Sequence, residues 1–194
     1  MNVLSLLTKD EEKYVRYVSY EARETIFHED DECRSIGIVV EGSVSIKTWS
    51  LLGNEIIFNT LKSGQAFGNN LIFSSSPFYK GDVVTLTKTQ IAFIEKEDLL
   101  DLLKKNNGFL LYYLERQSDM SKALNSKIRL LSLGSARERL LYLLEDNDGS
   151  YRYTTITALA AELNLERETL SRTISSLVEE RLIIRDGKTI KIRP

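Results

Sequence analysis

Two arginines and a glutamate lie close together near the C-terminus, in the segment Glu166-Arg167-Glu168-Thr169-Leu170-Ser171-Arg172. Arginine is suited to bind guanine through O6 and N7, and glutamate accepts a hydrogen bond from cytosine N4. Arg167, Glu168 and Arg172 lie away from the apolar positions of the same helical pattern, which are Leu170, Ile174 and Leu177. We therefore predict that these three side chains contact base edges in the major groove of double-stranded DNA.

Neighbouring hydroxyl groups and one lysine are candidates for phosphate contacts, which fix register without reading sequence. They are Thr169, Ser171 and Lys188. The role of Glu166 stays open, because a carboxylate suits a helix N-terminus but repels a nearby phosphate. A competing interpretation treats Glu168 and Arg172 as a solvated pair four residues apart on an amphipathic helix. The surrounding helix-turn-helix pattern favours base contact.

The elements that must position these residues follow from the flanking sequence. Small Ala160 and Ala161 permit close packing of a first helix, and Asn164-Leu165-Glu166 interrupts it before the second. Beyond the second helix, residues 182–185 and 189–192 alternate around Asp186-Gly187, which is a strong hairpin signal. A helix-turn-helix followed by a hairpin predicts a winged helix over residues 134–194. Its first helix opens with a capping box at 135–138, after Gly134 as a hinge or left-handed cap.

A long helix is predicted from Phe109 to about Leu133, a run without proline or glycine. Its pattern alternates spacings of four and three, with polar Gln117 and Ser121 at the centre and apolar residues at the ends, which are Leu110, Leu114, Leu124, Ile128 and Leu131. This heptad seam suits a parallel coiled coil between two copies of the chain. The alternative is that the stripe packs on the protein's own N-terminal domain. We expect a homodimer.

The segment from Glu24 to about Ile94 has a strand-like pattern, with β-branched and aromatic runs separated by glycine and proline. Short helices are predicted from Thr8 to about Val18 and over 95–103. The expected fold class is α+β: an N-terminal antiparallel, jelly-roll-like β-roll, a long dimerisation helix and a C-terminal winged helix-turn-helix. The corresponding domains are an effector-type roll at 1–106, the helix at 107–133 and the DNA-binding domain at 134–194.

Composition excludes several classes of function. The 194-residue chain has one cysteine and one histidine, too few for a multi-cysteine or iron–sulfur site or for cupin-type metal catalysis. We therefore expect no metal site and no enzyme. No apolar run reaches the roughly 18 residues of a membrane span, and the start does not resemble a signal peptide, so we expect a cytoplasmic protein without membrane contact. The net charge of −2 decides nothing about nucleic acid.

The order of a roll, a dimer helix and a winged helix resembles the Crp/Fnr superfamily of bacterial transcription regulators. Residues 166–172 are most similar to that family's recognition helix, and 137–140 to the start of its first DNA-domain helix. Val40-Glu41-Gly42-Ser43-Val44 resembles the family's strand-turn element, and Gly64-Gln65-Ala66-Phe67-Gly68 its glycine-bracketed turn. The resemblance covers nearly the whole chain. It implies a cyclic-nucleotide-binding-like domain and an inverted-repeat operator with TGTGA-type half-sites, and it makes RNA polymerase a further candidate partner.

The sequence departs from the cyclic-AMP receptors of that family. Those receptors place a glutamate after the Phe-Gly turn and an Arg-Ser pair further on, where this chain has Asn69-Asn70 and 77–82 without arginine. Asn70 can still bond a hydroxyl and Lys80 can meet an anion, but lysine lacks the planar fork of a phosphate clamp. We therefore expect no cyclic AMP. Haem is also not expected, because His28 and Cys33 are the only strong candidate ligands.

Control of the protein is left open by the sequence. One hypothesis is an unidentified small-molecule effector held near Gly68, Asn70, Lys80, Gln117 and Ser121. A second is a constitutive regulator that has lost ligand control, with Gln117 and Ser121 fixing coiled-coil register instead. A third is a regulator that binds a ligand or partner protein and lacks specific DNA recognition. The first is favoured, because the glycine turns that would frame a pocket are kept.

Overall fold

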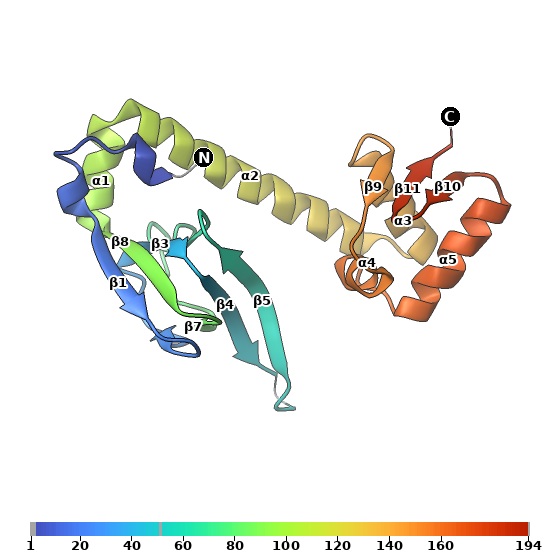
Figure 1. The fold of residues 1–194 in the computed structure, drawn as a ribbon, viewed down its shortest axis with the longest axis horizontal. Coiled ribbons are helices and arrows are strands. Elements are labelled where there is room, and N and C mark those ends of the chain that lie inside the picture. Colours follow the sequence, from blue (N-terminus) through green and yellow to red (C-terminus); the bar gives the residue numbers. More distant parts are fainter. Residues whose placement is uncertain (1–2, 51, 194) are drawn as a thin grey trace. The chain divides into compact units, whose positions relative to one another are not determined.

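A computed structural model describes residues 3–50 and 52–193, and the chain forms two compact units that divide between Ser118 and Asp119 (Figure 1). Helix α2 (Asn107–Ser132) continues across the division, and each unit has its own buried core. The expected α+β class is confirmed, with a β-roll, a long helix and a winged helix-turn-helix in that order. No helix in the described part of the chain has both the length and the apolar character needed to cross a membrane.

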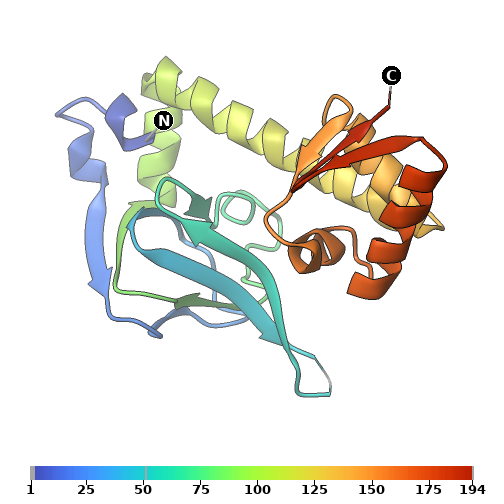
Figure 2. The same cartoon turned by 45° about the vertical axis from the view of Figure 1, so that its right-hand side comes forward.

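Two antiparallel four-stranded sheets form the roll. The first has the order β1-β8-β3-β6 and contains β1 (Arg16–Tyr20), β8 (Thr89–Glu95), β3 (Ser35–Glu41) and β6 (Ala66–Phe67). The second has the order β2-β7-β4-β5 and contains β2 (Thr25–Phe27), β7 (Asp82–Thr85), β4 (Ser43–Trp49) and β5 (Glu55–Lys62). Strands β4 and β5 run side by side as a long hairpin (Figure 2). Residues from both sheets, among them Val39, Val44, Val83 and Ile91, share one core and are fully buried.

Asn106 separates two helices that follow the roll. Helix α1 (Lys96–Lys105) buries Leu99 and Leu102 against the roll, which confirms the helix expected over 95–103. The Oδ1 atom of Asn106 then accepts a hydrogen bond from the Phe109 amide at 2.9 Å, as an N-cap does. Its Nδ2 donates to the Leu6 carbonyl and to Glu11. The long helix therefore begins at Asn107, which agrees with the predicted helix at 107–133 and lies two residues before the start of the pattern at Phe109.

The helix predicted from Thr8 to about Val18 is wrong. Only a 3-10 turn, η2 (Glu12–Tyr14), follows the 3-10 helix η1 (Val3–Leu6), and the chain then enters β1. Half of the predicted capping box exists, since the Thr8 amide donates to Glu11 at 2.9 Å. The local signal is outweighed because the five residues of β1 pair with β8 along their whole length. Tertiary pairing thus decides this segment.

The second unit is built from α3 (Ala136–Glu145), β9 (Ser150–Arg152), α4 (Ile156–Glu162), α5 (Arg167–Glu179), β10 (Ile183–Asp186) and β11 (Thr189–Ile192). The strands form a sheet of order β10-β11-β9. The winged helix predicted from sequence is confirmed, but the left-handed cap at Gly134 is wrong, because Gly134 is absent from the glycines with positive φ. The C-terminal carbonyls of α2 are capped by a side chain, as described below.

Candidate nucleic-acid interface

The turn between α4 and α5 is held by main-chain bonds and one left-handed residue. Thr155 is the N-cap residue of helix α4, and its hydroxyl accepts a hydrogen bond from the Ala158 amide at 3.0 Å. It ends before Asn164, which has a φ of 52°. Asparagine tolerates this conformation better than most residues. The Leu165 amide then donates to the Ala160 carbonyl at 2.8 Å and closes the turn.

Helix α5 has one buried face and one exposed face. Leu170, Ile174 and Leu177 are at most 2% exposed and belong to the core of the second unit. The five candidate DNA contacts on this helix are all exposed: Arg167, Glu168, Thr169, Ser171 and Arg172. The structure therefore brings all of them to the solvent side of a single helix.

Glu168 and Arg172 form an ion pair on this exposed face. Their side chains are 85% and 80% exposed, and Arg172 Nη2 lies 3.3 Å from Glu168 Oε2. Such a pair contributes little to stability, so both groups stay available to a ligand at small cost. Glu166 is the N-cap residue of α5, and its side chain makes no capping hydrogen bond.

The wing carries the remaining candidate, Lys188. It is exposed in the turn between β10 and β11, next to Gly187, which has a φ of +55°. Tyr153 fixes this turn, because its amide donates to the Lys188 carbonyl at 3.0 Å and its hydroxyl to the Gly187 carbonyl at 3.2 Å. The wing and α5 thus both present cations to solvent.

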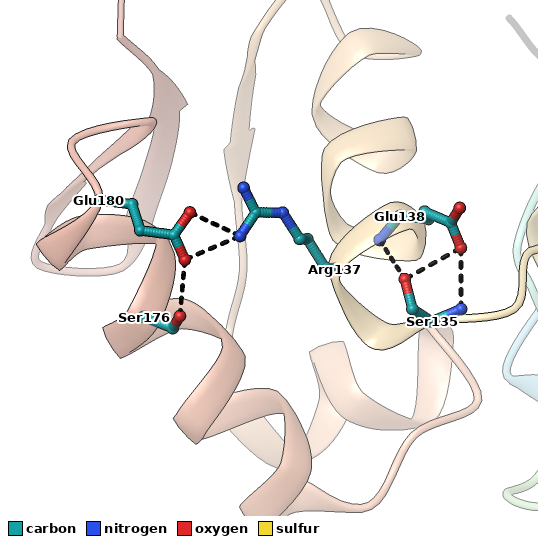
Figure 3. Close-up of polar contacts among 5 residues, drawn as sticks. All are labelled: Ser135, Arg137, Glu138, Ser176 and Glu180. Carbon is teal, nitrogen blue, oxygen red and sulfur yellow. Dashed lines mark hydrogen bonds and ion pairs between the residues drawn. The ribbon is translucent and has the colours of Figure 1, made fainter.

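One ion pair that the sequence did not reveal joins α3 to the C-terminal end of α5 (Figure 3). Arg137 Nη1 donates to both carboxylate oxygens of Glu180, at 2.8 and 2.6 Å, and the Ser176 hydroxyl donates to the same carboxylate at 2.9 Å. These hydrogen bonds hold the pKa of Glu180 below its ordinary value, with the Arg137 bond as the largest cause. Arg137 and Glu180 are 43 residues apart in sequence, and no local sequence pattern indicates that they meet. The predicted capping box of Ser135 and Glu138 is confirmed.

The predicted dimer seam lies on α2. In the first unit Leu110 is half-buried and Leu114 is exposed; in the second unit the remaining seam residues are exposed, which are Leu124, Ile128 and Leu131. Leu130, one position from Leu131, is instead buried in the winged-helix core. The seam is therefore open to solvent in a single chain.

The candidate effector residues do not gather at one place. Gly68 is buried with a φ of +80°, and a Cβ there would lie 2.9 Å from the Ser35 carbonyl oxygen, so this turn requires glycine. Asn70 and Lys80 are exposed, and Lys80 Nζ lies 3.5 Å from Asp30 Oδ1. Ser121 is exposed and belongs to the second unit.

Gln117 contacts Asn69, the neighbour of the candidate residue Asn70. Its Nε2 donates to the Asn69 carbonyl at 2.8 Å, and the Asn69 side-chain amide donates back to Gln117 Oε1 at 3.3 Å. The Tyr113 hydroxyl also donates to the Asn69 carbonyl, at 2.9 Å. These bonds join the turn after Gly68 to α2. The sequence did not mark Asn69, because two of these three bonds go to its main-chain carbonyl.

Aromatic side chains fill the interior of the roll. Tyr79 is 2% exposed and stacks on Phe27, with ring centroids 4.7 Å apart. Phe67 and Phe93 meet Phe27 edge to face at 6.3 and 6.1 Å. Burial raises the pKa of the Tyr79 hydroxyl far above its ordinary value. The segment that follows the Phe-Gly turn therefore contributes to a packed core.

Two open depressions lie on the surface of the first unit. One, of about 360 Å³, is lined by side chains of the second sheet and its ends, among them Arg23, Lys47, Trp49 and Asp82. The other, of about 340 Å³, lies between the β5–β6 turn and α2, where Gly64 faces Tyr112, Glu115 and Arg116. Neither is lined by a candidate effector residue.

The single histidine is exposed and the single cysteine is buried. Over residues 3–50 and 52–193, no three His, Cys, Asp or Glu side chains are grouped to hold a metal ion. His28 is exposed, with Nδ1 3.6 Å from Asp82. Cys33 is buried, and burial raises the pKa of its thiol, which disfavours the reactive thiolate.

Comparison with known proteins agrees with this architecture. The cyclic nucleotide-binding domain family matches residues 17–106. The cAMP-activated global transcriptional regulator CRP of Haemophilus influenzae is 26% identical over 183 residues, which cover 89% of this chain and 82% of the relative. The cyclic AMP receptor protein of Thermus thermophilus is 26% identical over 184 residues, covering 90% and 82%.

Solved structures share the fold. The catabolite activator protein of Thermus thermophilus, 24% identical, has a TM-score of 0.58 and is covered over 94% of its length by 100% of this chain. A mutant of CooA from Carboxydothermus hydrogenoformans, 17% identical, has a TM-score of 0.67 with 100% and 92% coverage. The shared fold combines a cyclic-nucleotide-binding-type roll with a winged helix.

Over most of its length the chain is therefore similar to transcription regulators of the Crp/Fnr superfamily. The Haemophilus influenzae relative is named as a transcriptional regulator and not as an enzyme, in agreement with the class expected from the sequence.

Proposed function

We propose that the protein is a homodimeric, sequence-specific DNA-binding transcription regulator that recognises an inverted repeat. The observation that carries this proposal is the exposed face of α5, where Arg167, Glu168 and Arg172 project from the first turns of the second helix of a helix-turn-helix. Arginine and glutamate side chains at such positions discriminate G·C pairs. Thr169, Ser171 and Lys188 supply candidate phosphate contacts around them.

Two copies are required for an inverted repeat. The exposed apolar residues of α2 give a self-complementary surface that a second α2 can cover, and two recognition helices related by a two-fold axis would meet half-sites about one helical turn apart. Light scattering of the protein with and without operator DNA tests the assembly. A monomer under both conditions would contradict the proposal.

DNA recognition is tested by selecting binding sites from a random pool and repeating the measurement over a range of salt. We expect an enriched site with G·C pairs in each half and an affinity that falls linearly on a log-log plot against salt. Binding without enrichment would favour the alternative of a regulator that lacks specific DNA recognition.

Control of the regulator is proposed not to use cyclic AMP. The residues do not fit a cyclic nucleotide, because Tyr79 and Phe67 fill the interior of the roll and Lys80 is directed to Asp30. Its relatives named as cAMP-activated do not transfer that ligand to this chain. A ligand at 100 times its dissociation constant adds about 2.7 kcal/mol of stability, so a thermal shift assay with cyclic AMP is decisive. We expect no shift.

The effector that we propose instead is a small molecule, and the depression between Gly64 and Arg116 offers it a place beside α2. The second candidate, a constitutive regulator, is favoured by the bonds of Asn69 to Tyr113 and Gln117, which hold the roll turn on α2. Binding of purified, ligand-free protein to the selected operator separates the two. Tight binding supports constitutive control, and weak binding that a metabolite mixture restores supports an effector.

A further inference from the structure

One arginine holds the ends of two helices in the second unit. Arg139, in the first turn of α3, donates through Nε to the Leu133 carbonyl at 3.1 Å and through Nη2 to the Leu131 carbonyl at 3.5 Å. Its Nη1 donates to the carbonyls of Leu163 and Asn164 at 3.2 and 2.9 Å. The first two carbonyls lie at the C-terminal end of α2, and the other two at the end of α4 and in the turn that leads into α5.

The four acceptors explain why the residue is arginine. The last carbonyls of a helix have no partner within the helix and carry the negative end of its dipole. A guanidinium offers five donors in a fixed plane, so a single group can satisfy two helix ends and fix the angle between them. Lysine has a compact ammonium that lacks this fork. Lys127 on α2 adds a separate bond to the Glu162 carbonyl at the end of α4.

Leu131 connects this cap to the predicted dimer seam. Its carbonyl accepts from Arg139, while its side chain is 44% exposed among the seam residues of α2. Asn164, at the other end of the cap, is the left-handed residue of the turn before α5. Arg139 therefore links the seam end of α2 directly to the turn that leads into the recognition helix.

We propose that Arg139 is a positioning residue that sets the orientation of the recognition helix relative to the two-fold axis of the dimer. It touches no base. Its effect is on the spacing between the two half-sites that the dimer accepts, and not on the base sequence of each half-site. The inference rests on the proposed function, since a spacing exists only for a dimer on an inverted repeat.

The experiment compares full-length wild type, Arg139→Gln, Arg139→Lys and Arg137→Gln on operators whose two half-sites are separated by spacers changed one base pair at a time. Wild type should prefer one spacing by roughly tenfold or more, and both Arg139 variants should reduce this preference to about twofold while they select the same half-site bases. Arg137 is the matched control, because it lies on the same helix but its side chain bonds to Glu180, at the C-terminal end of α5. Its variant should keep the wild-type spacing preference.

Hydrogen exchange on the free proteins gives a readout that does not depend on DNA. In the Arg139 variants, amide protection should fall together at the C-terminal end of α2 and in the turn at 163–166, and it should not fall there in Arg137→Gln. An unchanged spacing preference, a loss of half-site base preference, or increased exchange at only one of the two ends would overturn the inference. If Arg139→Gln does not fold, Arg139→Lys carries the test. If wild type binds paired half-sites no better than single ones, the proposed function fails, and hydrogen exchange alone decides whether Arg139 couples the two helix ends.

Discussion

The winged helix and the roll use side chains in opposite ways. The winged helix exposes its charged residues on one face of α5 and buries an apolar stripe of three residues behind them. The roll turns its aromatic residues inward, where Phe27, Phe67, Tyr79 and Phe93 pack on one another. A DNA-reading surface needs exposure and periodicity, whereas a ligand pocket needs space that side chains leave empty. The first unit has the backbone of a cyclic-nucleotide-binding-type roll, but aromatic side chains fill its interior.

The largest expected effect concerns the dimer. Leu124→Glu combined with Ile128→Glu places two charges in the exposed stripe of α2 and should abolish pairing of the helices. Because specific DNA binding exceeds non-specific binding by about 4–10 kcal/mol, operator affinity should fall at least about 100-fold. Sedimentation and operator titration measure the two effects together.

Lys122→Glu is the charge-matched control for this pair, since it also lowers the net charge by two but lies on the other side of the helix from Leu124. It should remain a dimer. Equal loss in both variants would trace the effect to charge repulsion from DNA and would break the seam assignment.

The next largest effect is a loss of stability when a side chain in the interior of the roll is truncated. Phe67→Ala removes a ring that is 2% exposed, and such a truncation costs about 3–5 kcal/mol when the cavity cannot collapse. Chemical denaturation of the full chain measures it, with the partly exposed Phe73→Ala as a comparison. A loss below about 1 kcal/mol for Phe67→Ala would mean that the interior is loosely filled, and it would reopen the case for a ligand there.

Helical periodicity carried most of what was predicted for the winged helix. Leu170, Ile174 and Leu177 mark the buried face, so the exposed positions of the same helix follow from the sequence. The Asp186-Gly187 turn likewise predicts the wing, whose strands end and begin at Asp186 and Thr189. Local spacing is enough wherever function and fold belong to one helix or one hairpin.

The roll depends on residues that no local pattern joins. Phe67 packs against Gly37, where a Cβ would lie 2.2 Å from the ring, and Tyr79 stacks on Phe27 from 52 positions away. The sequence marks each residue as apolar and does not show that they meet. The same holds for Asn69 with Gln117 and for Arg139 with two helix ends. Contacts of this kind, between residues distant in sequence, decide whether a pocket in the roll is open or filled.

A smaller effect is expected on half-site recognition. Arg167→Ala should cost about 1–3 kcal/mol of operator binding and relax the preference at one base pair, because a bidentate contact to guanine is lost. Lys188→Ala should instead weaken all sequences alike and reduce the salt slope by about 1, as a phosphate contact does. Titration of single-base operator variants distinguishes the two. Uniform weakening by Arg167→Ala would move it to the phosphate class.

The capping box of α3 gives an effect on stability of about 1 kcal/mol. The Ser135 hydroxyl accepts from the Glu138 amide at 3.1 Å, and Glu138 Oε2 accepts from the Ser135 amide at 2.9 Å. Ser135→Ala removes one half of this exchange, for which caps typically lose about 0.5–2 kcal/mol. Thermal unfolding followed in the helix signal measures it. A variant as stable as wild type would show that Glu138 alone supports the helix end.

The smallest effect concerns the pKa of one carboxyl group in the winged helix. In the roll, burial raises the pKa of Tyr79 and Cys33, while in the winged helix hydrogen bonds from Arg137 and Ser176 lower the pKa of exposed Glu180 from 4.5. Because the folded pKa of Glu180 lies below its unfolded value, its contribution to stability is present above the unfolded pKa and is lost as pH falls through the folded one. Arg137→Gln should therefore raise the pKa of Glu180 toward 4.5 and flatten the acid limb of the stability curve. Side-chain NMR titration of both proteins measures the shift. If the pKa stays low in the variant, Ser176 and not Arg137 is its main cause, and the contact that joins α3 to α5 is weaker than its two short hydrogen bonds indicate.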